Sequence, residues 1–95
     1  MSEIVLTRET SRDLERLIRT HSLPPQTPRR VRRSLEILRE FAAAGVGLRG
    51  RWKSYRFLVG PWRWMIFVYR YDPDRDAAIV LRVFDGRSES SPTGE

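Results

Sequence analysis

Hydrophobic residues in the first part of the chain change from a strand-like to a helix-like spacing. A short β-favouring run predicts a strand at about 3–7. Leu14, Leu17 and Ile18 then fall at spacings of three and four, which places them on one face of a helix. That helix is expected to end near His21, because the two prolines that follow shortly afterwards cannot continue it.

A second helix has clearer boundary signals. Thr27 is a good N-cap, Pro28 is favoured at the first helical position, and Gly45 is a natural C-terminal stop. Apolar residues recur between these signals at helical spacing: Val31, Leu35, Leu38 and Ala42. The pattern predicts a helix over about 28–44, which forms an αα-hairpin with the first helix and has one apolar side to cover.

The second half of the chain has the pattern of strands separated by turns. A glycine-rich, basic connector at 45–53 precedes the first alternation of apolar and polar residues, and Gly60-Pro61 interrupts it. An Asp-Pro-Asp-Arg turn lies further on. The predicted strands are 55–59, 62–71 and 77–84.

The predicted order β-α-α-β-β-β is an α+β pattern, with a helical hairpin packed on one face of a mostly antiparallel four-stranded sheet. We expect a single domain over residues 1–87, because 95 residues leave no room for a second core. Residues 88–95 are rich in Ser, Gly and Pro and are expected to form a flexible C-terminal tail.

Strand parity assigns the side chains to the two faces of the predicted sheet. If Gly60-Pro61 is the centre of a two-residue hairpin, Val59 pairs with Trp62, and paired residues share a face. The face expected to meet the helices then carries Tyr55, Phe57, Val59, Trp62, Trp64, Ile66, Val68, Ile79, Leu81 and Val83. The opposite, open face carries Ser54, Arg56, Leu58, Arg63, Met65, Phe67, Tyr69, Tyr71, Val80, Arg82 and Phe84. The assignment depends on register, because a one-residue slip reverses a whole strand.

An open face that combines arginines with aromatic side chains is typical of a binding surface. The predicted phosphate- or target-binding residues are Lys53, Arg56, Arg63, Arg82 and Arg87. The predicted partner contacts are Met65, Phe67, Tyr69, Tyr71 and Phe84. The alternative is a solvated sheet face on which arginine stems lie over the aromatic rings.

Composition and charge narrow the classes of function. The net charge is +6, and Lys53 is the one lysine among 18 basic residues, so the chain favours an acidic partner, either nucleic acid or protein. With no cysteine and one histidine, we expect no disulfide, no metal site and no cofactor. The sequence lacks a signal-peptide pattern and a long apolar run, which predicts a cytoplasmic protein without membrane contact.

A series of short motifs, taken in order, resembles the RelE/ParE toxin family over nearly the whole chain. The motifs are Leu48-Arg49-Gly50, Tyr55-Arg56, Val59-Gly60-Pro61-Trp62-Arg63, Tyr69 and Leu81-Arg82-Val83-Phe84-Asp85-Gly86-Arg87. The resemblance implies the β-α-α-β-β-β fold and a toxin neutralised by an antitoxin encoded beside it. The expected antitoxin has an acidic or amphipathic C-terminal segment.

The resemblance implies one of two modes of action. The RelE branch cleaves mRNA on the ribosome, where basic side chains stabilise the scissile phosphate and a C-terminal tyrosine or histidine aids proton transfer. By position, Arg56, Arg63 and Arg87 match basic residues of that site and are the candidate catalytic residues. The ParE branch generally acts on DNA gyrase instead.

The chain departs from the RelE-type pattern at three places. Leu58 stands where a second lysine is usual, Asp85 stands where a histidine is frequent, and no tyrosine follows Arg87. Arginine stabilises a phosphorane but is a poor proton acceptor. The sequence therefore leaves an enzymatic activity open and favours a ParE-like toxin that inhibits growth by binding an essential target, gyrase being the expected one. The alternatives are a RelE-like mRNA endonuclease and a non-toxic basic nucleic-acid-binding module.

Overall fold

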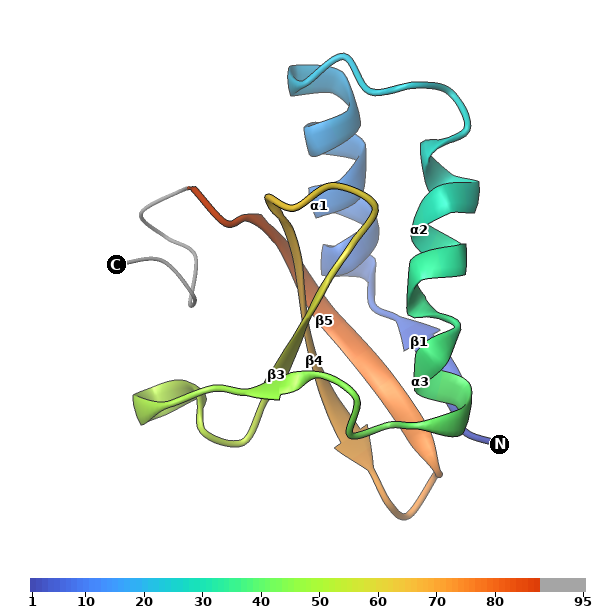
Figure 1. Ribbon diagram of the computed structural model, residues 1–95, viewed down its shortest axis with the longest axis vertical. Helices are drawn as coiled ribbons and strands as arrows, with labels where there is room; N and C mark the ends of the chain where they lie inside the picture. Colours follow the sequence, from blue (N-terminus) through green and yellow to red (C-terminus); the bar gives the residue numbers. More distant parts are fainter. Residues whose placement is uncertain (88–95) are drawn as a thin grey trace.

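The computed structural model describes residues 1–87 and places a helical hairpin against a sheet that contains the first and the last strand of this region (Figure 1). The elements are β1 (Glu3–Leu6), α1 (Arg8–Thr20), α2 (Thr27–Leu35), α3 (Ile37–Glu40), β2 (Val46–Gly47), the 3-10 turn η1 (Gly50–Trp52), β3 (Arg56–Val59), β4 (Met65–Asp72) and β5 (Ala77–Asp85). The predicted α+β class is confirmed. The flexible tail predicted for 88–95 lies outside the described residues.

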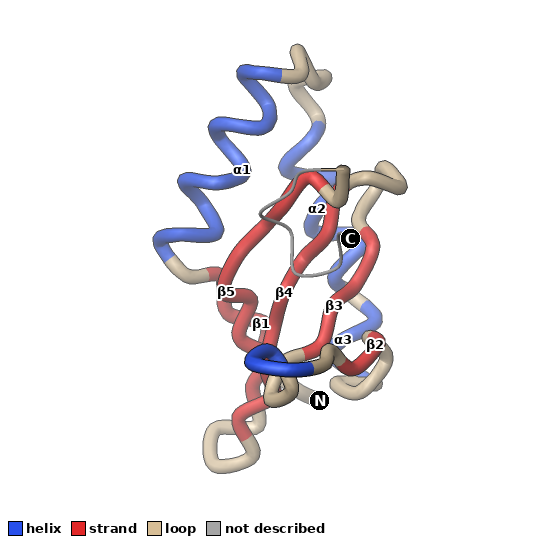
Figure 2. Tube along the Cα trace, turned by 90° about the vertical axis from the view of Figure 1, so that its left-hand side faces the viewer, coloured by secondary structure: helices blue, strands red, loops and turns tan. Residues whose placement is uncertain are grey.

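The sheet is mixed and has five strands in the order β1-β5-β4-β3-β2. β1 pairs parallel with β5, and the other neighbours are antiparallel. The additional strand, relative to the four predicted, is the two-residue β2, which lies inside the segment predicted as a connector. Figure 2 shows η1 in front of the sheet, with α2 and α3 behind it.

Helix α1 continues the edge of the sheet where β1 ends. β1 pairs with β5 only as far as Val80. Beyond that point, Thr7 N and Thr10 Oγ1 donate to the Val80 carbonyl at 3.1 and 2.7 Å, and Thr7 Oγ1 donates to the Leu81 carbonyl. Asp13 accepts from Val83 N at 3.0 Å. Polar groups of the first turns of α1 thus replace a neighbouring strand and satisfy backbone groups of β5.

The predicted second helix begins at Thr27, one residue before the expected start, with Gln26 instead of Thr27 as the N-cap, and it ends earlier than expected. It breaks at Glu36 into α2 and α3, and the helical chain ends at Glu40 instead of 44. The hydroxyl of Tyr69 donates to the Ala42 carbonyl at 2.7 Å and accepts from Gly45 N at 2.9 Å. These long-range bonds hold the chain in a turn that local helix signals cannot indicate.

The hairpin between β3 and β4 is longer than predicted, and the face assignment was wrong. Val59 pairs with Ile66 instead of Trp62, and residues 60–64 form a loop. The shift of four positions preserves parity, so Phe57, Val59, Ile66 and Val68 share a face as expected. However, the helices cover the opposite face, where Met65, Phe67 and Tyr69 are fully buried. β4 is apolar and buried on both faces from Met65 to Tyr69, so alternation alone could not identify the helix-covered side.

A second correction concerns the last strand. An irregularity in the pairing shifts the register of β4 against β5 between Val68 and Tyr69, because Val68 pairs with Arg82 whereas Tyr69 pairs with Val80. The extra residue places Arg82 and Phe84 on the face of Val68 and Ile66 instead of the face of Met65. The predicted row of Arg56, Met65 and Arg82 does not form.

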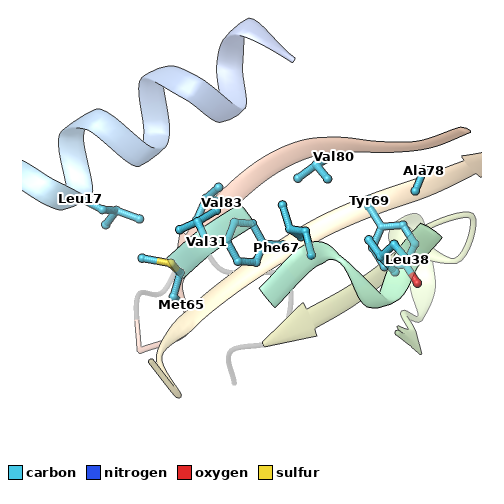
Figure 3. Close-up of a cluster of buried hydrophobic side chains, with 10 residues drawn as sticks. Leu17, Val31, Leu38, Met65, Phe67, Tyr69, Ala78, Val80 and Val83 are labelled. Atoms are coloured by element: carbon cyan, nitrogen blue, oxygen red, sulfur yellow. The ribbon is translucent and has the colours of Figure 1, made fainter. Parts of the chain in front are cut away.

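The core lies between the helices and the sheet (Figure 3). The helices contribute Leu17, Val31, Leu35 and Leu38, and the strands contribute Met65, Phe67, Tyr69, Ala78, Val80 and Val83. Val83 is a core residue as predicted. Val80 also belongs to the core and Leu58 packs against it, although both were expected on the open face.

Candidate functional site

The arginines that the sequence predicted on one surface occupy three separate places. Arg63, in the β3–β4 loop, and Arg87, after β5, line one shallow recess together with Trp64, Ile66 and Gly86. We call these five residues the terminal recess. Arg82 points toward α1 and binds Asp13 instead.

Arg56 lies apart from the terminal recess, at the start of β3. Its Nη1 donates to the Gly45 carbonyl at 2.9 Å, and it lines a separate pocket with Ala42, Ala43 and Tyr71. The predicted convergence of Arg56 with Arg63 is therefore wrong, although Arg63 and Arg87 do come together. Lys53 is exposed after η1.

Asp85 organises the side chains next to the terminal recess. Arg87 donates to both of its carboxylate oxygens, from Nε at 3.0 Å and Nη2 at 2.9 Å, and its backbone N–H adds a third bond at 2.9 Å. His21 Nε2 lies 3.1 Å from Asp85 Oδ2. The Arg87 side chain, with its backbone N–H and His21, holds the pKa of Asp85 well below its usual range. A charge-assisted fork of this kind fixes the direction of the Arg87 guanidinium.

The low pKa of Asp85 predicts a specific dependence of stability on pH. A carboxyl whose pKa is lower in the folded than in the unfolded chain stabilises the fold above its unfolded value, about 3.9, and loses that contribution as pH falls. The difference in unfolding free energy between wild type and Asp85→Asn is therefore expected to narrow between about pH 5 and pH 2. Urea unfolding followed by circular dichroism at each pH measures this difference in unfolding free energy. A difference that stays constant over this range contradicts the assignment.

A series of stacked side chains connects the β3–β4 loop to the helical hairpin. His21 stacks on Trp64 with ring centroids 4.5 Å apart, and Trp62 stacks on Trp64 at 6.2 Å. Arg30 lies 4.6 Å from the centroid of Trp62, and Arg87 lies 5.3 Å from that of Trp64. The sequence correctly placed His21 at the end of a helix, but it did not indicate the contacts with Trp64 and Asp85, which are distant in the chain.

A second cluster of charged side chains forms around Asp13, a buried acidic residue with 3% of its surface exposed. It binds Arg82 through Nε at 2.7 Å and Nη2 at 3.1 Å, and Arg16 Nη2 lies 3.3 Å away. The hydrogen bonds to Asp13 raise the pKa of Arg82. Asp13 was not among the predicted site residues, although a signal for it is present in the sequence. It falls three residues after Thr10 and four before Leu17, inside the buried stripe of α1.

The predicted partner-contact residues divide by burial. Met65, Phe67 and Tyr69 are fully buried and are not available to a partner in this fold, so this part of the prediction is wrong. Burial raises the pKa of Tyr69, whose hydroxyl already bonds to Ala42 and Gly45. Tyr71 is 41% exposed, and Phe84 is partly exposed beside Trp52.

The chemistry available near the terminal recess is cationic and aromatic. Two guanidinium groups and an indole can bind phosphate or carboxylate groups and pack against apolar ones. Among residues 1–87, no group of three His, Cys, Asp or Glu side chains is arranged to hold a metal ion. No helix in that same range is long and apolar enough to cross a membrane.

The α+β arrangement of a helical hairpin on this five-stranded sheet is the fold of RelE/ParE-like toxins. The chain matches a chain of the toxin–antitoxin complex RelBE2 from Mycobacterium tuberculosis with a TM-score of 0.66 at 23% identity, covering 88% of this chain and 96% of that one. It also matches a chain of the chromosomal ParDE system from P. aeruginosa with a TM-score of 0.69 at 15% identity, covering 90% and 96%.

YafQ from E. coli is a third similar structure, with a TM-score of 0.65 at 15% identity over 96% of this chain and 100% of that one. No protein-family model matches the sequence, and no curated protein matches it. The likeness therefore concerns the fold, which all three structures share with this chain over nearly their full lengths.

Proposed function

We propose that this protein is the toxin of a bacterial type II toxin–antitoxin system, neutralised by a cognate antitoxin. The observation that carries the proposal is the shared fold over nearly the full length of the RelBE2 and ParDE chains, two toxin–antitoxin systems. The strong positive charge and the arginine-lined terminal recess agree with a protein that binds an acidic partner or target.

The mode of action that the geometry favours is ParE-like, with growth inhibited by binding to an essential target, and DNA gyrase as that target. The three arginines matched to RelE-type cleavage residues do not share one site, because Arg56 bonds to Gly45 away from Arg63 and Arg87. Arg87 is also held by Asp85 at the position where a proton-transferring histidine is frequent. A binding surface needs no proton acceptor there.

One observation favours the RelE-like alternative, an mRNA endonuclease. Arg63 and Arg87 lie in the same recess, and His21 contacts Trp64 and Asp85 beside it. An imidazole paired with a carboxylate is a suitable proton-transfer group. The alternative therefore stays as a second candidate.

The test is growth after tightly induced expression of wild type, with total RNA and plasmid topology sampled from the same cultures. Wild type is expected to stop growth, and Arg63→Ala/Arg87→Ala is expected to weaken this effect at least about tenfold in viable count, because arginines in an interface often carry much of the binding energy. Arg33→Ala/Arg75→Ala is the matched control, because it removes the same charge from exposed positions outside the recess.

Each outcome selects one hypothesis. Relaxed plasmid with intact message supports the gyrase target, and loss of message in translating cells supports the endonuclease. Harmless wild type that binds DNA or RNA with a strong salt dependence supports the non-toxic nucleic-acid-binding module and contradicts the toxin proposal. Equal effects of both double variants contradict the role of the terminal recess.

A further inference from the structure

His21 belongs to a closed cycle of four side chains, two of which line the terminal recess. Its ring stacks on Trp64 with the two planes 15° apart, and its Nε2 lies 3.1 Å from Asp85 Oδ2. Asp85 binds the guanidinium of Arg87 at 2.9 and 3.0 Å, and that guanidinium lies 5.3 Å from the centroid of Trp64. Because Trp64 and Arg87 are walls of the terminal recess, a change of charge on His21 takes place directly behind its surface.

The hydrogen bonds of His21 accommodate both the neutral and the protonated imidazole. Its Nδ1 lies 3.0 Å from Thr20 Oγ1. In the neutral form, Nε2–H donates to the Asp85 carboxylate and Nδ1 accepts from the Thr20 hydroxyl. In the protonated form both nitrogens donate, and the hydroxyl turns to accept. His21 is also the C-cap of α1, and positive charge is favoured at the C-terminal end of a helix.

His21 is the group in this cycle that changes charge near neutral pH. The chain has one histidine, and imidazole is the side chain that ordinarily titrates between about pH 5 and 8. The pKa of Asp85 is held well below its usual range, so this carboxylate stays ionised there. The elements packed around the cycle also bring in Asp13 and five arginines, Arg16, Arg19, Arg30, Arg63 and Arg82. Arginine stays protonated in proteins, and carboxylates ordinarily titrate near pH 4.

Protonation of His21 changes the balance of charge at the terminal recess. With a neutral imidazole, Asp85 offsets the charge of Arg87, and Arg63 is the remaining positive charge of the recess. An imidazolium adds a second cation to the same Asp85 oxygen that binds Arg87 Nη2. A unit charge within about 10 Å of a bound dianion at a partly exposed surface changes its affinity by about threefold or more at low ionic strength.

We propose that His21 makes the terminal recess a pH-sensitive anion site, which binds the anionic groups of its target more tightly when the imidazole is protonated. The inference rests on the proposed function, because the terminal recess is the surface assigned there to the target, and it adds regulation of that surface by protons. A bound anion stabilises the imidazolium. The affinity is therefore highest below the titration range of His21 and falls as the pH rises through it.

The experiment uses the full-length protein and sulfate, which remains a dianion from pH 5.5 to pH 8. Dissociation constants are measured at both pH values and constant low ionic strength, from the NMR shift of the Gly86 amide in the recess. Wild type is expected to bind sulfate about threefold or more tightly at the lower pH. His21→Gln is expected to bind equally at both, with the affinity of wild type at pH 8. Arg19→Gln is the matched control, because it removes an exposed charge from the same end of α1 and keeps the imidazole.

A reciprocal measurement uses wild type alone. Since the chain has one histidine, its Cε1–H signal in the NMR spectrum is unambiguous. Saturating sulfate is expected to move the midpoint of that signal's titration to higher pH, because the proton and the anion must strengthen each other's binding by the same factor. This measurement decides the result if thermal melts show that His21→Gln is unfolded.

The outcomes separate this inference from the proposed function. Equal sulfate affinity at both pH values overturns the inference, and so does a pH dependence that His21→Gln retains. Sulfate that leaves the Gly86 amide unshifted overturns it as well. If any of these is found while wild type stops growth and Arg63→Ala/Arg87→Ala does not, the proposed function stands without its regulation by protons. If wild type is harmless in cells but its sulfate affinity depends on pH through His21, the proposed function fails and the recess remains a pH-sensitive anion site.

Discussion

Replacing Phe67 with alanine is expected to lower the free energy of unfolding by about 3–5 kcal/mol. Phe67 is fully buried at the centre of the core between the helices and the sheet, as Figure 3 shows. Removing the ring takes away its transfer free energy and leaves a cavity among side chains of both layers. A domain of this size is commonly stable by about 5–15 kcal/mol, so the variant is expected to be close to unfolding at 37 °C.

Tyr71→Ala is the matched control, because Tyr71 lies four residues further along β4 with the same parity but is 41% exposed. It is expected to cost about 1 kcal/mol or less. Urea unfolding followed by tryptophan fluorescence compares the two variants. Because the sequence pattern alone placed both residues on an open face, equal and small losses would support that reading and contradict the fold described above.

Replacing Asp13 with alanine is expected to cost about 2–3 kcal/mol. The carboxylate accepts from the backbone of Val83 and from two arginines, and it joins α1 to the part of β5 that β1 does not reach. Without it, the arginines can turn toward water, but the Val83 N–H lies at a buried position and loses its partner. An unsatisfied buried donor accounts for most of the expected cost.

Glu15→Ala is the control on the same helix, because Glu15 is exposed and its substitution removes the same charge as Asp13→Ala. Its effect on the unfolding midpoint is expected to be small. Hydrogen exchange adds a local readout: the Val83 amide is expected to lose protection in Asp13→Ala while the amides of β4 keep theirs. Unchanged protection at Val83 would show that Asp13 does not support the edge of β5.

The sequence pattern predicted the class of the fold and most of its element boundaries because these depend on local spacing. Thr27 and Pro28 marked the start of α2, and apolar runs marked the strands. Face parity within β3 and β4 was also correct, since it depends only on alternation. Parity does not indicate which face of the sheet the helices cover, because β4 is apolar on both faces and either face could form the core.

The candidate site was predictable only in part for a similar reason. Arg63 and Arg87 line the same recess, as expected, because the start of β4 pairs with the end of β5. A small error in the predicted register leaves these two chain segments close together. Arg82 was misplaced because the register shift between Val68 and Tyr69 has no sequence signal in this segment. Asp13, His21 and Trp52 act through contacts with residues far along the chain, which a local pattern does not contain.

The parallel pairing of β1 with β5 has a consequence for the order of folding during synthesis. Glu3 pairs with Ala77, so β1 leaves the ribosome well before the strand with which it pairs has been made. The helical hairpin and the β3–β4 hairpin involve close neighbours in the chain and can form earlier. The sheet edge on which α1 is seated is therefore completed only after β5 has been made, and a truncated chain that stops before β5 lacks the strand to which both β1 and α1 attach.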